Sequence, residues 1–179
     1  REVGHSTHSF SNALRSALRE DPDVILVGEM RDLETIGLAL TAAETGHLVF
    51  GTIHASSAWQ TFGRIYDLFP EGERPQIRKL LAYNLQAIVY QKLLPTLRED
   101  TARIPALEIL LSTPIVTKYI LEKREGELLD VIKKSHEEGM VDLNTALLRL
   151  VESEWVSLKV ALEATPKPED LKMKIKGID

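Results

Sequence analysis

Two strand ends in this sequence carry side chains that can do chemistry on a phosphate. A short apolar run at residues 23–27 leads through Gly28 to a carboxylate, Glu29. A second apolar run at residues 46–53 leads to an imidazole, His54. An apolar strand that delivers an acid at its carboxyl end is how nucleotide-hydrolysing α/β domains place a base beside a phosphate. The pattern therefore indicates phosphate chemistry at the edge of a buried sheet.

The segment between the two runs predicts a single helix. Asp32 is placed to cap its start, and Gly46 is placed to end it in a left-handed turn. A strand, a helix and a strand in this order imply parallel strands joined by a right-handed crossover. Glu29 and His54 are then expected at the same edge of the sheet. The helix has one apolar face, which consists of Leu33, Ile36, Leu40 and Ala43.

The rest of the chain is predicted to be mostly helical, with one further pair of strands. Residues 93–97 and 104–111 read as an antiparallel pair that extends the sheet at one side. Asp142 is placed to cap an amphipathic helix. Residues 165–179 begin Thr-Pro-Lys-Pro, continue lysine-rich and predict a frayed tail. The other expected helices cover residues 10–18, where Ser9 can cap, 58–67, 75–87 and 158–164.

Composition limits the classes of function. A length of 179 residues with 44% hydrophobic content fits one globular domain, with room for a helical appendage. The net charge of −5 argues against a surface built to bind nucleic acid. The sequence has no cysteine, which excludes disulfides and thiolate metal sites and fits a reducing cytosol. No stretch reads as a membrane span, because the longest uncharged one, residues 45–63, is polar and broken by turns.

Two sequence boxes resemble those of a known family. Residues 28–35 read Gly-Glu-Met-Arg-Asp-Leu-Glu-Thr, and residues 43–47 read Ala-Glu-Thr-Gly-His and lead on to His54. These look like the atypical Walker B box and the His box of the PilT-like branch of the type II/IV secretion-system ATPases. Members of that branch are hexameric motors of type IV pili and related secretion machines. The resemblance runs from the N-terminus to about residue 155.

The resemblance implies an α/β fold, in which a partial RecA-like ATPase core precedes a C-terminal helical subdomain. The implied limits are residues 1–112 for the C-terminal portion of the core, 113–165 for the helical subdomain and 166–179 for a tail. The sequence contains no G-x-x-x-x-G-K-[ST] loop, and in the family this Walker A loop and an N-terminal domain come earlier in the chain. We therefore expect this chain, which begins with Arg1, to be the C-terminal part of a longer motor.

The resemblance assigns the two strand-end side chains to ATP hydrolysis. Glu29 is the candidate for the residue that orients or deprotonates the attacking water. Without the family match it could equally be a solvated strand end or an acid at a helix start. His54 is the candidate contact to the γ-phosphate. The ordinary alternative is a histidine at a strand end whose ring nitrogens form hydrogen bonds with the backbone. The family's motif has glycine before the glutamate, and Gly28 agrees, so a single carboxylate has to position water and contact the hydration shell of the metal.

Two arginines lie near these boxes in the sequence. Arg64 matches by position an arginine that contacts nucleotide in the family. Arg31 could touch phosphate or brace the turn, and its place beside Asp32 and Glu34, the other acids of the Walker B box and helix start, favours the turn. For both arginines, a surface ion pair is the ordinary alternative.

The implied ligands are ATP and Mg²⁺, with the metal bound through the nucleotide and without a direct protein ligand. Zinc is not expected. His47 and His54 are an odd number of residues apart on one strand, so their side chains point to opposite faces. His5 and His8 have no acid nearby at ligand spacing.

The chain departs from the family at two places, and the second bears on the direction of work. The His box usually continues His-Thr, but this chain has Ala55. The retraction motors carry an Ala-Ile-Arg-Asn-Leu-Ile signature, whereas residues 115–120 here read Ile-Val-Thr-Lys-Tyr-Ile. A retraction paralogue or an auxiliary motor therefore fits as well as the principal retraction motor.

The expected function is that of an ATP-hydrolysing hexameric motor that drives type IV pilus retraction and twitching motility. The implied partners are further copies of the chain and the platform protein of the inner membrane, with no nucleic acid. The implied location is the cytoplasm, peripheral to that membrane through partners. We expect the present chain alone to be inactive. The alternatives are a non-catalytic interaction or oligomerisation fragment, and an assembly or secretion motor of the same superfamily.

Overall fold

The computed structural model describes residue 5 and residues 8–177. Contacts along the chain group these residues into two compact units. The first unit contains the described residues up to Ala55, together with Gln60–Leu85 and Thr117–Glu125, and the second contains Ser56–Trp59, Gln86–Val116 and the residues from Gly126 onward. These units are defined by contacts and not by family limits, so the predicted domains 1–112, 113–165 and 166–179 stay a prediction.

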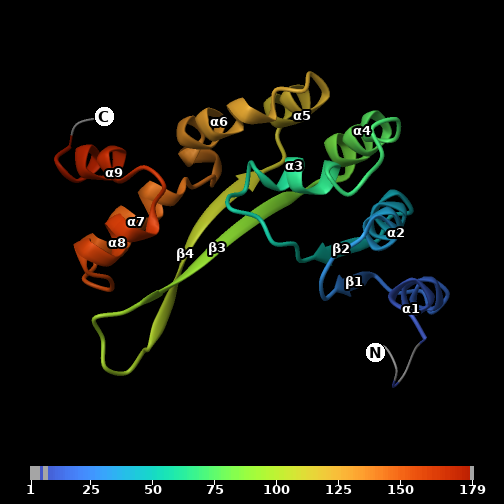
Figure 1. The fold of residues 1–179 in the computed structure, drawn as a ribbon, viewed down its shortest axis with the longest axis horizontal. Helices are drawn as coiled ribbons and strands as arrows, with labels where there is room; N and C mark the ends of the chain where they lie inside the picture. The colour runs from blue at the N-terminus through green and yellow to red at the C-terminus, as the bar shows by residue number, and fades with distance from the viewer. Residues whose placement is uncertain (1–4, 6–7, 178–179) are drawn as a thin grey trace. The chain divides into compact units, whose positions relative to one another are not determined.

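The first unit contains the strand, helix and strand that the sequence predicts (Figure 1). β1 and β2 are parallel, and Val24 pairs with Leu48 at one end of the register and Val27 with Gly51 at the other. The crossover between them is α2, as expected for parallel neighbours. The elements of this unit are α1 (Phe10–Ala17), β1 (Val24–Val27), α2 (Leu33–Glu44), β2 (Leu48–Gly51), α3 (Thr61–Tyr66) and α4 (Arg74–Asn84).

One face of this small sheet is buried and the other is open. The buried face packs against α1 and α2 through Leu14, Ile25, Val27, Ala39 and Ala42. Because side chains alternate along a strand, the residues between these point to the opposite face. That face is apolar and exposed, with Leu26 at 74% and Phe50 at 54% of full exposure. Its four large side chains are Val24, Leu26, Leu48 and Phe50.

The helix starts follow the predicted caps. The side chain of Ser9 accepts a hydrogen bond from the backbone N–H of Asn12 at the start of α1. The carboxylate of Asp32 accepts one from the N–H of Thr35 at 2.8 Å at the start of α2. Gly46 has φ +96°, a backbone conformation that residues with a side chain rarely adopt. The chain reverses there after α2. The predicted caps at Ser9 and Asp32 and the predicted turn at Gly46 are therefore confirmed.

Three predicted boundaries of helices and strands are wrong between residues 58 and 97. The helix expected from residue 58 begins only at Thr61, because residues 56–60 form turns. The helix expected to reach residue 87 ends at Asn84, since Leu85 is extended with ψ 132°. The strand expected at 93–97 begins at Ala87 instead and is much longer. The extent of this strand is determined by pairing with its partner strand, because local propensity alone does not separate strand from helix here.

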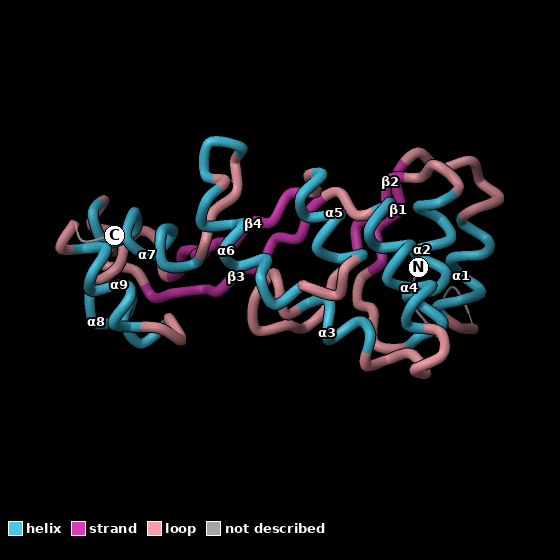
Figure 2. Tube along the Cα trace, turned by 90° about the horizontal axis from the view of Figure 1, so that it is seen from above, coloured by secondary structure: helices cyan, strands magenta, loops and turns pink. Residues whose placement is uncertain are grey.

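The second unit is built on that long hairpin. β3 (Ala87–Pro95) and β4 (Arg103–Leu111) are antiparallel, as predicted. They form a two-stranded sheet of their own, so the expectation that they extend the first sheet is wrong for the strands that the structure describes. Figures 1 and 2 show helices gathered on this hairpin, where α7 contacts β4 and α8 contacts β3. The helices after β4 are α5 (Pro114–Leu121), which crosses the boundary of the two units, α6 (Leu128–Lys134), α7 (Leu143–Glu152), α8 (Leu158–Ala164) and α9 (Pro168–Ile175), with 3₁₀ turns at Glu125–Glu127 and His136–Glu138.

The end of the chain is an ordered helix. The predicted frayed tail is wrong over Pro168–Ile175, which forms α9. Pro168 lies in the first turn, where it is well tolerated, and the side chain of Leu171 is fully buried. This leucine belongs to one apolar cluster with Leu94, Leu147 and Val156. Burial of Leu171 therefore contributes to ordering a segment whose composition suggests disorder.

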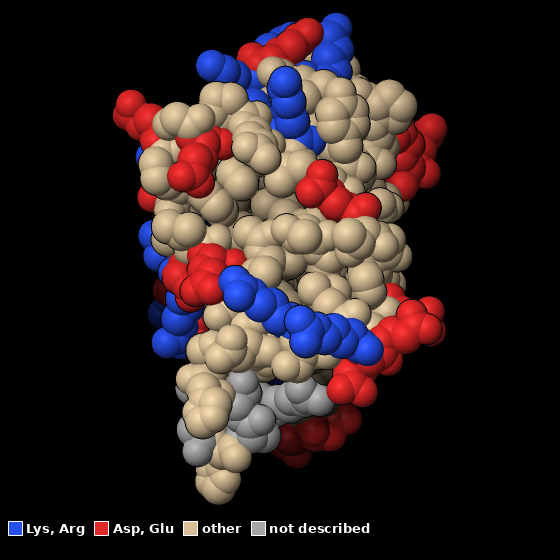
Figure 3. Space-filling view, turned by 90° about the vertical axis from the view of Figure 1, so that its right-hand side faces the viewer, with Lys and Arg blue, Asp and Glu red and all other residues tan. Residues whose placement is uncertain are grey.

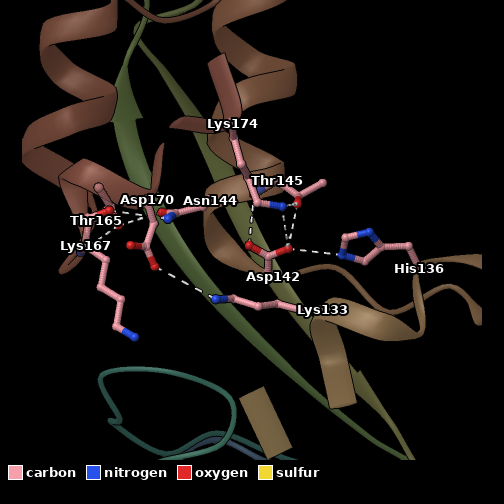
Figure 4. A network of polar contacts seen from close by, with 9 residues as sticks. All are labelled: Lys133, His136, Asp142, Asn144, Thr145, Thr165, Lys167, Asp170 and Lys174. Carbon is pink, nitrogen blue, oxygen red and sulfur yellow. Dashed lines mark hydrogen bonds and ion pairs between the residues drawn. The ribbon is translucent and has the colours of Figure 1, made fainter. Parts of the chain in front are cut away.

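A polar network also joins α9 to α7 (Figure 4). Asp142, which is 2% exposed, caps α7 and accepts hydrogen bonds from the N–H and hydroxyl of Thr145. Its Oδ2 also lies 3.0 Å from His136 Nε2 and 3.6 Å from Lys174 Nζ of α9. Burial favours a higher pKa of Asp142, but these hydrogen bonds and the Lys174 charge together lower it. The carboxylate is therefore stable in its ionised form.

Leu171→Ala tests whether α9 is part of the core. The change removes a fully buried side chain, so we expect a loss of about 2–5 kcal/mol in the free energy of unfolding of the second unit. Urea unfolding followed by fluorescence measures this, since Trp59 and Trp155 both lie in that unit. Met173→Ala on the same helix is the control, because Met173 is 47% exposed and its loss should change stability by less than about 0.5 kcal/mol. Equal stability of the two variants would contradict a packed α9.

Asp142→Asn tests the network through pH. Because the folded pKa of Asp142 is lowered, its stabilisation is complete above the pKa of an unfolded aspartate, about 3.9, and is lost as the pH falls through the folded pKa. We expect the wild type to exceed the variant by about 1–3 kcal/mol at neutral pH. Urea unfolding at a series of pH values should show this difference shrinking below about pH 4. Asp130→Asn, at an exposed position of α6, is the control, and a difference that grows on acidification would refute the assignment.

Candidate functional site

Glu29 and His54 meet at the carboxyl ends of β1 and β2. His54 Nε2 lies 3.3 Å from Glu29 Oε1. Arg31 Nη2 donates to the other oxygen, Oε2, at 2.5 Å. The side chain of Glu29 is 27% exposed, whereas those of Arg31 and His54 are 77% and 89% exposed. The prediction that the two strand-end residues emerge at one edge is confirmed, and the carboxylate lies between two nitrogen groups that face solvent.

The backbone around Glu29 is fixed by the end of β2. The N–H of Met30 donates to the carbonyl of Thr52 at 2.8 Å, and the Thr52 hydroxyl donates to the carbonyl of Gly28. Gly51 allows this approach, because a Cβ there would lie 2.7 Å from Met30 Sδ. The loop that carries the carboxylate is thus tied directly to the strand that carries the histidine.

Sequence reasoning missed the contribution of Gly51 and Thr52. A glycine followed by a hydroxyl residue at the end of an apolar strand is a signal for close backbone approach. That signal could have suggested a contact there, but only the pairing of β1 with β2 identifies Gly28 and Met30 as the partners.

The electrostatics of the cluster keep Glu29 ionised. The hydrogen bond from Arg31 is the largest influence and lowers the pKa of the carboxyl, while burial opposes it and the charges of Arg31 and His54 reinforce it. In return, Glu29 raises the pKa of Arg31. An ionised carboxylate is the form that can accept a proton from water or orient it. The arginine that secures this form also occupies one of its oxygens.

The other predicted site residues have separate positions. Asp32 caps α2, and Glu34 forms an exposed ion pair with Arg15 at 3.8 Å, so both support the helix. Arg31 lies on Glu29, which agrees with bracing the turn. Arg64 lies exposed in α3, and no hydrogen bond or ion pair joins it to Glu29 in the described part of the chain. The nucleotide roles of Gly28, Arg31, Arg64 and the acids stay predictions.

Three broader features bear on the ligand class. Over residue 5 and residues 8–177, no group of three or more His, Asp or Glu side chains is arranged to bind a metal ion. None of the helices described in that same part of the chain has the length and apolar composition needed to cross a membrane. On the face drawn in Figure 3, acidic and basic side chains of the described residues are interspersed around uncharged surface.

Comparison with known proteins gives the family. The family described as "Type II/IV secretion system protein" matches residues 4–144, which is most of the chain. The chain belongs to this family.

Individual relatives lie in its pilus branch. A Neisseria gonorrhoeae protein named "Twitching motility protein" is 46% identical over 171 residues, which cover 96% of this chain and 46% of that protein. The "Type IV pilus retractation ATPase PilT" of Pseudomonas aeruginosa is 46% identical over 170 residues, which cover 95% of this chain and 49% of that protein. The chain thus spans about half the length of these relatives.

A solved structure supports the fold class. The crystal structure of the pilus retraction motor PilT with bound ADP matches with a TM-score of 0.86 and 44% identity, over 96% of this chain and 48% of that one. The predicted α/β, RecA-like ATPase fold with a C-terminal helical part agrees with this match, and so does the resemblance to PilT-like motors. The ADP belongs to that structure.

Arg31→Gln tests the electrostatic arrangement without any activity assay. Loss of the guanidinium removes the largest influence that lowers the pKa of Glu29, so that pKa should rise toward the ordinary glutamate value of about 4.3. ¹³C NMR titration of the Glu29 carboxyl measures the change. Arg15→Gln, which breaks the separate pair with Glu34, should leave the Glu29 titration as it is in the wild type. An unchanged Glu29 titration in Arg31→Gln would refute the contact.

Proposed function

We propose that this chain forms part of an ATP-hydrolysing motor that drives type IV pilus retraction, with Glu29 as the residue that activates water. The observation that carries the proposal is the meeting of Glu29 and His54 at the carboxyl ends of two parallel strands. In open α/β sheets this edge is where ligands bind. The family membership and the 46% sequence identity to a pilus retraction ATPase support ATP as the substrate.

The two side chains suit different parts of the reaction. Glu29 is ionised and has its oxygens directed to solvent-facing groups, so it can orient a water and accept its proton. His54 is exposed and can donate a hydrogen bond from Nε2 to a terminal phosphate oxygen. Arrival of such an oxygen would give His54 and Arg31 a second acceptor and so loosen their contact with Glu29. Substrate binding would then free the base at the moment it is needed.

The remaining parts of the site come from the family resemblance. Mg²⁺ would neutralise phosphate charge, and Glu29 is the carboxylate placed to contact its hydration shell. Gly28 allows the loop to approach the nucleotide, and Arg64 is proposed as a phosphate contact from the same or a neighbouring subunit. The apolar sheet face of Val24, Leu26, Leu48 and Phe50 is suited to packing against further elements of a complete ATPase core, which would include the phosphate-binding loop.

The same resemblance supports a wider proposal for the intact protein. It would work as a hexameric ring in the cytoplasm, at the inner membrane, where it acts on the pilus platform protein. Whether it is the principal retraction motor, a paralogue or an assembly motor depends on the helix over residues 115–120, which departs from the retraction signature.

Glu29→Gln in the longest natural polypeptide that contains this chain tests the function. We expect kcat for ATP hydrolysis to fall about 10²–10⁴-fold, the usual effect of removing a general base, while ATP still binds. A coupled phosphate-release assay measures the rate, and binding of a fluorescent ATP analogue measures affinity. Glu20→Gln is the matched control, since this exposed acid of the first unit lies outside both sequence boxes and its loss should leave kcat unchanged.

The outcomes separate the alternatives. A wild-type protein that binds ATP without hydrolysing it would favour the non-catalytic interaction module. Full activity in Glu29→Gln would overturn the assignment of the base while leaving the ATPase class in place. Absence of both binding and turnover in the longest natural form would overturn the enzyme proposal.

A further inference from the structure

A second buried carboxylate lies outside the proposed site. Glu108 in the middle of β4 is only 3% exposed. Its Oε1 accepts a hydrogen bond from the backbone N–H of Ala58 at 2.7 Å, and the carboxylate also accepts one from the N–H of Leu143. Burial raises the pKa of Glu108, the two backbone hydrogen bonds lower it, and nearby Asp142 raises it further. A charged group in this position needs a specific arrangement of donors around it.

The two donors come from segments far apart in the chain. Ala58 is fully buried and belongs to Ser56–Trp59, the short segment that follows the His54 strand end. Leu143 is the first residue of α7, whose cap is Asp142. The start of a helix presents unpaired N–H groups and a partial positive charge, so a carboxylate is well satisfied there. One side chain thus joins a strand, a loop and a helix.

Ala58 lies just after the point at which the chain leaves the first compact unit. Residues up to Ala55 belong to the first compact unit, and Ser56–Trp59 belongs to the second. The chain therefore leaves the first unit after Ala55, one residue beyond His54. The Ala58 N–H to Glu108 hydrogen bond fixes the far end of this crossing to the second unit. Fixing that end offers a displacement of His54 a route of four peptide units into the second unit.

Packing alone does not explain an acid at this position. The neighbours of Glu108 on the same face of β4 are Ala106 and Leu110, both almost fully buried apolar residues. A leucine at position 108 would fill a similar space without burying a charge. What a leucine cannot do is accept hydrogen bonds from two separate segments. The carboxylate therefore contributes hydrogen bonds to this junction that an apolar side chain would not supply.

We propose that Glu108 is a positioning residue that couples the His54 strand end to the start of α7, by fixing the segment Ser56–Trp59 to β4. The inference rests on the proposed function, since His54 must respond to nucleotide for any signal to pass. It assigns to Glu108 a role in transmission and not in chemistry, so ATP binding at the site does not require it.

Hydrogen exchange measured by mass spectrometry on the longest natural polypeptide tests the proposal, with and without a non-hydrolysable ATP analogue. In the wild type we expect the analogue to change exchange both in peptides over residues 24–31 and 48–54 and in the peptide over residues 142–147. In Glu108→Gln the changes over 24–31 and 48–54 should persist. The change over 142–147 should fall about fivefold or more, the scale of ordinary coupling between sites.

Two further variants keep the test decisive. Glu108→Met removes both carboxylate oxygens and leaves only a weak sulfur acceptor while it fills the space. It replaces Glu108→Gln if the glutamine variant fails to fold, and the same result is expected. Asp142→Asn is the matched control, because it disturbs the same end of α7 and leaves the Ala58–Glu108 hydrogen bond intact. It should keep the nucleotide-dependent change over 142–147.

The possible failures are distinguishable. Wild-type coupling in both Glu108 variants, or an equal loss of coupling in Asp142→Asn, would show that Glu108 has only a structural role and would overturn the proposal. A wild type that responds over 24–31 and 48–54 but not over 142–147 would overturn the inference and leave the proposed function standing. A wild type without any response to nucleotide would overturn both.

Discussion

The parallel pairing of β1 with β2 is the constraint on which the candidate site depends. Parallel strands end at the same edge of a sheet, so the residues that follow them converge without any further device. Here the register carries Val27 opposite Gly51, and the residues just beyond them form the contacts between Met30, Thr52 and Gly28. Antiparallel pairing would separate Glu29 and His54 by the length of the strands. The chemistry follows from strand direction before any side chain is considered.

Two glutamates of this chain show how surroundings assign roles to one residue type. Glu29 is partly exposed beside an arginine and a histidine, and its pKa is lowered. Glu108 is buried among apolar side chains with backbone donors, and its pKa is raised. The first is partly exposed and ionised, as the proposed role of a base requires. The second is immobilised from two sides, which suits a residue that joins segments and does not suit one that exchanges protons with water.

The features that sequence could predict are those decided by local chemistry. The caps at Ser9, Asp32 and Asp142, and the reversal at Gly46, each depend on a few consecutive residues. The strand ends at Glu29 and His54 were predictable for the same reason, since an apolar run followed by a polar residue defines them. Their convergence needed one more step, the rule that a single helix between two strands makes the strands parallel.

The features that sequence missed are decided by partners far along the chain. β3 begins at Ala87 because residues 87–92 pair with residues 106–111, and no local pattern encodes that pairing. α9 is ordered because Leu171 enters an apolar cluster built from β3, β4 and α7. Glu108 reads locally as the polar member of an alternating strand. Only the structure shows that the residue faces inward and meets Ala58, fifty positions earlier in the chain.

The state of Glu29 bears directly on how turnover would be controlled. Both carboxylate oxygens contact nitrogen groups, and both of those groups are largely exposed and can move at little cost. In the proposed function, a triphosphate would offer them more negative charge than one carboxylate does, so nucleotide binding would release Glu29 by an exchange of partners. In the structure, the Glu29 oxygens are shared with Arg31 and His54. Under the proposed function, these contacts would link the availability of Glu29 as a base to the binding of nucleotide.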